Sequence, residues 1–181
     1  MARAFVDSWP DNTRMEKRLL QVPGTDPGIR SDYYYIAAAS RICWRCEKDS
    51  GVHGFILPAG FESLSVADEP QDDEWTRIDA PSLICYIDYL LPSAASQMMT
   101  HSSHYRLTYS NTTESLYWMN LCEHCDSKLG DHETFCELGQ GFEPVSAQQA
   151  ARIRLTQIDE PFAASVGTYS IGVEFFSHML R

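Results

Sequence analysis

Two short cysteine pairs are the residues of this chain best suited to chemistry. They are CWRC at 43–46 and CEHC at 122–125, and each has two residues between its cysteines. This spacing lets both thiolates of a pair point at one centre from a tight turn, and two such turns supply the four ligands of a tetrahedral zinc ion. We therefore predict a structural Zn²⁺ site. Its expected ligands are Cys43, Cys46, Cys122 and Cys125.

Two other kinds of chemistry are alternatives for a C-x-x-C pair. A thiol–disulfide centre usually follows a β-α-β pattern, and no such pattern precedes either pair. A catalytic zinc ion keeps one position open, which would require another side chain to replace a cysteine ligand. The candidates for that replacement are His53, His124, His132 and Cys136. The chain shows no paired acid–base or nucleophile–base arrangement, so we expect a protein that is not an enzyme.

The composition indicates a folded globular protein. Hydrophobic residues make up 44% of the chain and aromatic residues 12%. No apolar run approaches the roughly 20 residues of a membrane-spanning helix, and residues 1–10 lack the apolar core of a signal peptide. We therefore expect a cytoplasmic, reducing setting without membrane contact, in which paired cysteines more often bind metal than form disulfides.

The formal net charge of −11 is unevenly distributed. Residues 61–80 and 121–145 together carry an acidic excess equal to the whole net charge. Such a field opposes general binding to nucleic acid and suits either solubility alone or a partner protein with a basic face. The carboxylates that we expect in such a binding surface are Asp68, Glu69, Asp72, Asp73 and Glu74.

The surroundings of the first cysteine pair are basic and aromatic instead. They include Arg41, Trp44, Arg45 and Lys48. These side chains could neutralise phosphates and stack on the bases of a single strand, which makes a nucleic-acid-binding zinc ribbon the alternative function. Aromatic packing around a metal-stabilised core is the other role open to the rings, and the acidic net charge favours it.

Strand-like runs precede the cysteine pairs. Residues 33–39 and 52–57 are predicted as strands around the first pair, and residues 105–109 and 116–121 as a hairpin that leads to the second. Residues 81–91 place apolar side chains at spacings of 3, 4 and 7, which predicts a helix between the pairs. Further expected elements are a short helix at 13–20, a helical turn at 147–151 capped by Ser146, a strand at 152–158 and a helix or strand at 173–180.

Three segments together resemble zinc-ribbon proteins. They are ICWRC at 42–46, VHGFILP at 52–58 and YWMNLCEHC at 117–125. More narrowly, they are similar to a group of uncharacterised bacterial proteins with CWxC and YWxNxCxxC motifs. The resemblance covers residues 33–160 and implies zinc and a bacterial cytoplasmic setting, but it brings no activity.

These observations combine into one expectation of fold and function. We expect an α+β fold with zinc-ribbon-like paired knuckles, antiparallel strands and a large helix-containing insertion between the two CxxC pairs. Residues 1–32 would be peripheral, and residues 33–181 would form a single domain held together by zinc, with an acidic loop at 59–79. The expected function is non-enzymatic: an interaction protein, of inhibitor or immunity type, that binds a basic protein. The sequence indicates no oligomeric state.

Overall fold

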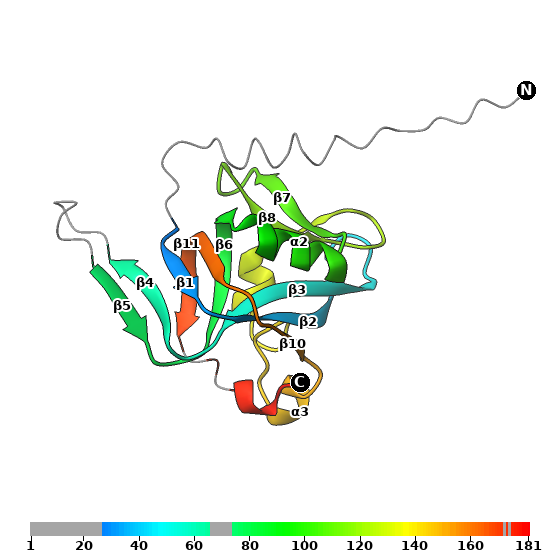
Figure 1. Cartoon of the computed structure of the whole chain (residues 1–181). Helices are drawn as coiled ribbons and strands as arrows, with labels where there is room; N and C mark the ends of the chain where they lie inside the picture. The colour runs from blue at the N-terminus through cyan, green and yellow to red at the C-terminus, as the bar shows by residue number, and fades with distance from the viewer. Residues whose placement is uncertain (1–26, 66–73, 172, 174) are drawn as a thin grey trace, which may run out of the picture.

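An antiparallel sheet organises the part of the chain that the computed structural model describes, which is residues 27–65, 74–171, 173 and 175–181 (Figure 1). Eleven strands of these residues belong to it. They are β1 (Ile29–Ser31), β2 (Tyr34–Ile42), β3 (Asp49–Leu57), β4 (Phe61–Ser65), β5 (Glu74–Ile78), β6 (Ser82–Leu90), β7 (Tyr105–Ser110), β8 (Ser115–Leu121), β9 (Lys128–Leu129), β10 (Arg154–Ile158) and β11 (Phe162–Ile171).

The strand order is β10-β2-β3-β6-β11-β1-β4-β5, and β8 joins this path through β6 while also pairing with β7 and β9. The contact between β6 and β8 is a single pair, Ile87 with Trp118. The β4–β5 hairpin lies at one end of the sheet, far from β10 at the other (Figure 1).

Helical segments are short. They are α2 (Pro92–His101), η2 (His132–Cys136), α3 (Ala147–Ala150) and η3 (Phe176–His178). Pro92 lies in the first turn of α2, where its missing N–H leaves no intrahelical bond unmade. The predicted helical turn is confirmed as α3, whose Ser146 side chain accepts the N–H of Gln149 at 3.2 Å. Among the described residues, no helix is both long enough and apolar enough to cross a membrane.

The central strands of the sheet are covered on both faces. In β2, Tyr34 and Ile36 face one apolar cluster while Tyr35 and Ala37 face the other, as the two-residue period of a strand requires. The first cluster, here called the α2 core, consists of Ile29, Tyr34, Ile36, Phe55, Leu57, Phe61, Ile84, Ile87, Leu90, Ala94, Ala95, Met98, Tyr105, Trp118, Phe162 and Ala164. The second, the knuckle core, consists of Tyr35, Ala37, Cys43, Val52, Ile56, Leu83, Cys85, Cys122, Leu129, Phe135, Phe142, Ala150, Ile153, Leu155 and Met179.

The α+β fold class predicted from the sequence is wrong. The described residues between the cysteine pairs consist mostly of strands, with α2 as their helix, and residues 82–90 are the central strand β6. Both faces of β6 are covered, so its apolar residues need not alternate with polar ones. Irregularities then mimic a helical period: Tyr86 has a positive φ of 54°, and the pairing with β11 shifts at Ser165/Val166. Ile84, Ile87 and Leu90 consequently all face the α2 core.

The expected acidic loop at 59–79 is also different in the structure. It contains β4 and β5, which pair in register from Phe61–Ile78 to Ser65–Glu74. Glu74 is exposed at the start of β5, whereas the other predicted acidic binding residues lie in 66–73, outside the described residues. The expected peripheral segment contributes β1, which pairs with both β11 and β4. The expected helix at 13–20 lies outside the described part of the chain.

The strands predicted around the cysteine pairs are confirmed as β2, β3, β7 and β8, and the strand predicted at 152–158 as β10. The C-terminal segment forms η3, and Leu180 then bridges to Arg154 of β10. Each loop that carries a cysteine pair connects two paired strands: β2 with β3 for the first pair and β8 with β9 for the second.

Candidate metal centre and the adjoining cavity

The first cysteine pair lies in the loop between β2 and β3. The N–H of Cys43 donates to the carbonyl of Lys48, and the N–H of Glu47 donates to the carbonyl of Cys43, both at 2.9 Å. Glu47 is in the left-handed region with a φ of 58°. The N–H of Arg45 points at the sulfur of Cys43 at 3.4 Å, which is the kind of donor that stabilises a thiolate.

The second pair repeats this geometry between β8 and β9. The N–H of Cys122 donates to the carbonyl of Ser127, and the N–H of Asp126 donates to the carbonyl of Cys122, both at 2.8 Å. Asp126 has a φ of 55°, and the N–H of His124 lies 3.4 Å from the sulfur of Cys122. Two sequences with little in common apart from the cysteines thus adopt the same knuckle, which argues that the cysteine spacing has a common purpose.

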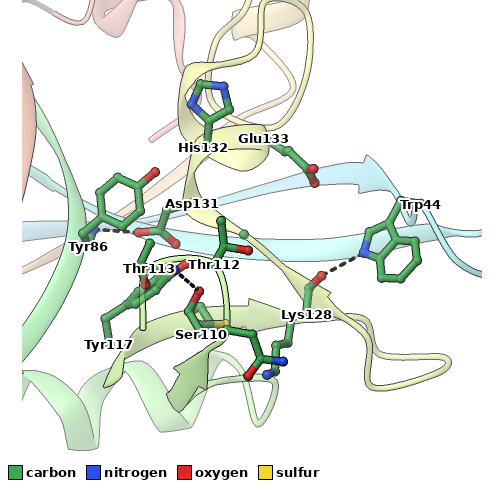
Figure 2. A pocket seen from close by; sticks show the side chains of 13 residues that line it. Trp44, Tyr86, Ser110, Thr112, Thr113, Tyr117, Lys128, Asp131, His132 and Glu133 are labelled. Carbon is green, nitrogen blue, oxygen red and sulfur yellow. Dashed lines mark hydrogen bonds between the residues drawn. The ribbon is translucent and has the colours of Figure 1, made fainter. Parts of the chain in front are cut away.

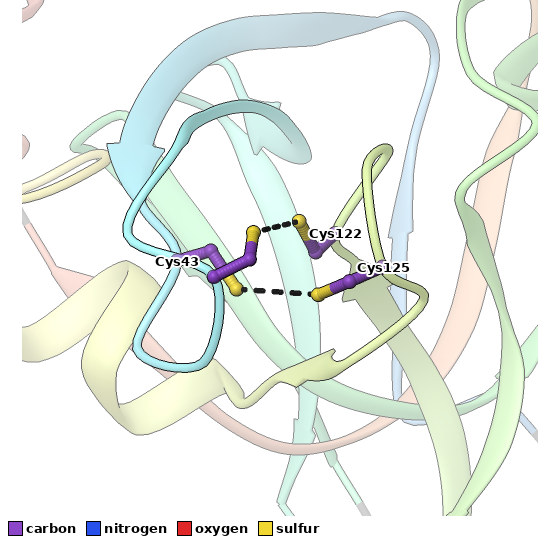
Figure 3. Close-up of side chains that lie close together, drawn as sticks. Cys43, Cys122 and Cys125 are labelled. Carbon is purple, nitrogen blue, oxygen red and sulfur yellow. Dashed lines mark hydrogen bonds between the residues drawn. The ribbon is translucent and has the colours of Figure 1, made fainter.

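The two knuckles face each other and bring four sulfur atoms together (Figure 3). The Sγ atoms of Cys43 and Cys125 are 3.7 Å apart, those of Cys46 and Cys122 are 3.6 Å apart, and all four lie within 4.8 Å of one another. A tetrahedral zinc site with bonds of about 2.3 Å has sulfur–sulfur edges of about 3.8 Å. The four cysteines therefore fit a tetrahedral metal ion.

The four thiols differ in their affinity for protons. Hydrogen bonds from the side chain and backbone of Ser127 lower the pKa of Cys125 to about 6. The backbone N–H of Lys48 lowers the pKa of Cys46, but burial and the neighbouring thiols outweigh it and raise the value to about 11. At neutral pH the cluster thus retains protons, which a binding metal ion would displace.

Asn120 fixes the second knuckle against β3. Its side-chain oxygen accepts the N–H of His53 at 2.7 Å, and its side-chain nitrogen donates to the carbonyl of His53 at 2.8 Å. The amide group therefore imitates a strand partner where β3 and β8 come close. Asn120 is 1% exposed, so these bonds satisfy polar groups that would otherwise be buried alone.

The second knuckle also bonds to the start of β3. Glu123 accepts the N–H of Gly51 at 3.1 Å, and its own N–H donates to Ser50 Oγ at 3.2 Å. The His124 Nε2 donates to the carbonyl of Asp49 at 2.8 Å. This hydrogen bond holds the His124 ring against the backbone of β3. The ring therefore lies outside the sulfur cluster.

The structure brings the four predicted cysteine ligands together. Of the residues considered as replacements, His53, His124, His132 and Cys136 are not part of the metal-suited group found among the described residues. The arrangement thus offers four cysteine sulfurs, which is the number of ligands that a tetrahedral metal ion takes.

The predicted basic and aromatic rim of the first knuckle is only partly a surface. Arg41 is 7% exposed, and it contacts Glu133 Oε2 at 3.4 Å and Thr134 Oγ1 at 3.2 Å. It is therefore a buried link to η2 rather than a contact for a partner. Trp44 is 64% exposed, and its Nε1 donates to the carbonyl of Lys128 at 2.9 Å. Arg45 and Lys48 are exposed.

A cavity of about 580 Å³ adjoins the first knuckle, and sequence reasoning did not predict it (Figure 2). It lies between Trp44, the β7–β8 hairpin and the start of η2. Its lining residues are Trp44, Tyr86, Ser110, Asn111, Thr112, Thr113, Tyr117, Met119, Lys128, Gly130, Asp131, His132 and Glu133. Aromatic, hydroxyl and charged side chains thus meet at one concave surface, which is more polar than the lining of most small-ligand sites.

Asp131 is the most unusual group in this cavity. It is 1% exposed, and its Oδ2 accepts the backbone N–H of Tyr86 at 2.7 Å. Its Oδ1 is buried and has no hydrogen-bond partner among the described residues. Burial raises the pKa of Asp131 to about 7, although the hydrogen bond from Tyr86 lowers it. The bond explains the conformation of β6 at this point, because the left-handed Tyr86 directs its N–H away from the sheet and toward η2.

Two tyrosines lie close enough to the carboxyl group to interact with its charge. The rings of Tyr86 and Tyr117 are 5.3 Å apart between centroids and meet edge to face. Burial, followed by the nearby charge of Asp131, raises the pKa of Tyr86 to about 12. Burial and Asp131 also raise the pKa of Tyr117, against hydrogen bonds from the Asp131 backbone and Ser110. Both tyrosines therefore stay neutral hydroxyl groups at physiological pH.

Fold and cluster together define an antiparallel β-sheet protein whose two C-x-x-C knuckles could hold one metal ion. Comparisons with protein-family models, with curated proteins and with solved structures find no match for this chain. Function is therefore inferred from the chain's own residues.

Proposed function

We propose that this chain is a non-enzymatic binding protein that is stabilised by a structural zinc ion and recognises a basic partner protein, in the manner of an inhibitor or immunity protein. The convergence of four Sγ atoms within 4.8 Å is the observation that carries the structural half of this proposal. Four thiolates in a tetrahedral arrangement favour zinc over harder cations, and four protein ligands leave no open position for catalysis.

The charge of the chain supports the choice of partner. The net charge is −11, and its acidic excess lies in two acidic segments, residues 61–80 and 121–145. Among the described residues of these segments, Glu74, Asp126 and Glu137 are exposed carboxylates. An acidic surface accelerates association with a basic partner and repels nucleic acid. Asp131 does not belong to this surface because it is buried.

Metal content tests the structural half. We expect one zinc ion per chain in the purified protein, loss of the metal in Cys122→Ser, and retention in the matched control Cys136→Ser, whose exposed thiol lies outside the cluster. A metal-free protein, or a Cys122→Ser variant with full zinc content, would contradict the proposal.

Charge neutralisation tests the partner. A triple variant, Asp72→Asn, Asp73→Asn and Glu74→Gln, should lose salt-sensitive capture of a basic protein. A control with the same change of net charge uses three exposed sites outside the acidic segments: Asp32→Asn, Glu114→Gln and Asp159→Asn. Equal capture by both triple variants would contradict a binding role for the first acidic segment.

Nucleic-acid binding is the second candidate, and one observation favours it: Trp44 is 64% exposed next to the exposed Arg45 and Lys48. Such a surface could stack a base and contact phosphates. Binding to a single-stranded oligonucleotide that weakens steeply with salt, and that is lost in Trp44→Ala, would support it. No binding at low salt would remove it.

A further inference from the structure

The cavity beside the first knuckle combines three kinds of surface. Its aromatic walls come from Tyr86 and Tyr117, with Trp44 at the edge, and its hydroxyl groups from the β7–β8 hairpin. Asp131 lies beside Tyr86, whose backbone N–H it accepts, and close to Tyr117 (Figure 2). Aromatic faces and a carboxylate are the two groups that recognise an organic cation, the first through the ring quadrupole and the second through charge.

No cation of the described residues lies within ion-pair distance of Asp131. The ionisable groups that its charge affects are Tyr86, Cys85, Tyr105, Tyr117 and Cys136, all of which are neutral when protonated. The carboxylate also keeps one buried oxygen without a partner. A buried charge without compensation is costly, so a cation that enters the cavity would interact with Asp131 more strongly than with an exposed carboxylate.

The charged residues at the rim do not supply that cation. Lys128 Nζ donates to the carbonyl of Tyr109 at 2.6 Å, which fixes its ammonium group to β7. Glu133 contacts Arg41 at 3.4 Å, so these two charges offset each other. His132 is exposed and directly follows Asp131. A ligand that carries its own positive charge is therefore the best complement to the cavity.

We propose that this cavity binds the primary ammonium group of a lysine side chain presented by the basic partner, with Asp131 as the counter-charge and Tyr86 and Tyr117 as the aromatic walls. This inference rests on the proposed function, because it specifies how the basic partner would be anchored. The volume of about 580 Å³ accommodates such a side chain, and lies within the range of small-ligand sites. A free polyamine carries the same ammonium chemistry and is the other source that the test must separate.

Binding of short peptides tests the inference on the full chain. The probes are Ac-Gly-Lys-Gly-NH₂ and Ac-Gly-Nle-Gly-NH₂, whose side chains differ by the ammonium group, with affinities measured by calorimetry or NMR. We expect the lysine peptide to bind at least tenfold more tightly than the norleucine peptide. Equal binding of the two peptides, or binding of neither, overturns the inference.

Two carboxylate variants locate the counter-charge. Asp131→Asn keeps an oxygen for the N–H of Tyr86 and removes the charge, so it should abolish the preference for lysine over norleucine. Asp159→Asn makes the same change of net charge at an exposed residue outside the acidic segments and the knuckles, and it should keep the preference. A preference that survives in Asp131→Asn, or disappears equally in both variants, contradicts the assigned role.

The pH dependence gives a readout that a purely structural aspartate would not change. Because burial raises the pKa of Asp131 to about 7, the affinity for the lysine peptide should increase about tenfold from pH 6 to pH 8. The share of this increase that is due to Asp131 is the part that Asp131→Asn removes. An affinity that is equal at pH 6 and pH 8 contradicts the inference.

Spermidine identifies the source of the ammonium group. Binding of the lysine peptide in preference to spermidine supports a protein side chain, whereas tighter binding of spermidine overturns the lysine assignment in favour of a free polyamine.

Failure of the inference differs from failure of the proposed function. A zinc-loaded protein that captures a basic partner in a salt-sensitive way but ignores the ammonium group of the peptides would overturn the inference alone.

Discussion

At the scale of single residues, the raised pKa of Asp131 predicts how the stability of the protein depends on pH. Its raised pKa means that the folded protein holds a proton that the unfolded chain releases from about pH 4 upward. Stability due to this group is therefore present at low pH and lost as the pH rises toward 7, by at most about 1.4 kcal/mol per pH unit. Denaturant unfolding of the wild type and Asp131→Asn from pH 4.5 to 7.5 measures this, and the difference between the two proteins removes contributions from other groups. A difference that does not vary with pH would contradict the raised pKa.

The close packing around Gly54 leads to a second prediction at the scale of single residues. A Cβ on this residue of β3 would lie 2.7 Å from Cε1 of Phe135, a buried ring stacked on Phe142. Gly54→Ala should therefore reduce the free energy of unfolding by about 1–3 kcal/mol, as overpacking of a tight core does. The control is Gly130→Ala, where the added atom meets nothing within 4 Å. Similar losses in both variants would show that the close contact is not the cause.

The residues also differ in how far the sequence could predict them. The four candidate cysteine ligands were predictable because each knuckle is a local structure, encoded in six consecutive residues. Asp131 was not, because its burial depends on the contact of η2 with the irregular turn of β6 at Tyr86, and these residues are distant in the chain. Arg41 was misjudged for the same reason, since its partner Glu133 comes from η2.

At the scale of elements, β6 shows the limit of hydrophobic periodicity. A spacing of three residues between Ile84, Ile87 and Leu90 predicts one face of a helix, but two irregularities place the same residues on one face of a strand. The flanking hairpins were predictable because their strands are rich in aromatic residues and end in turns, and because residues 105–109 alternate. The sequence carries no local mark of the pairing with β11 that decides between the two structures.

The left-handed residue of each cysteine knuckle leads to a prediction at the scale of elements. Glu47 and Asp126 occupy equivalent positions with φ values of 58° and 55°, a conformation that glycine adopts without strain. Glu47→Gly should leave the zinc content unchanged and raise the free energy of unfolding by up to about 1 kcal/mol, whereas the β-branched Glu47→Val should lower it. Thermal unfolding of the metal-loaded proteins measures both. A Val variant as stable as the Gly variant would contradict the left-handed conformation.

At the scale of the whole molecule, the sheet separates two cores, and the candidate metal centre belongs to one of them. Cys43 and Cys122 are part of the knuckle core, whereas the α2 core contains no residue of either knuckle. Metal removal should therefore destabilise the molecule unevenly. It should expose the β2–β3 and β8–β9 loops first and leave the pairing of β6 with β11 in place, because Ile84, Ile87 and Leu90 of that pair lie in the α2 core.

Hydrogen exchange before and after chelation tests this difference. We expect amide protection to fall by at least tenfold around Cys43–Lys48 and Cys122–Ser127, and to change much less at Ile84 and Ile87 in β6. Asn120 donates a hydrogen bond to β3 and Glu123 accepts one from it, and neither bond involves the metal. These bonds should therefore keep the second knuckle near the sheet and make reloading with zinc reversible. Asn120→Ala removes that support and should turn reversible metal loss into loss of the fold, whereas the exposed control Asn111→Ala should not. Uniform loss of protection across both cores on chelation of the wild type would show instead that the metal centre supports the whole sheet.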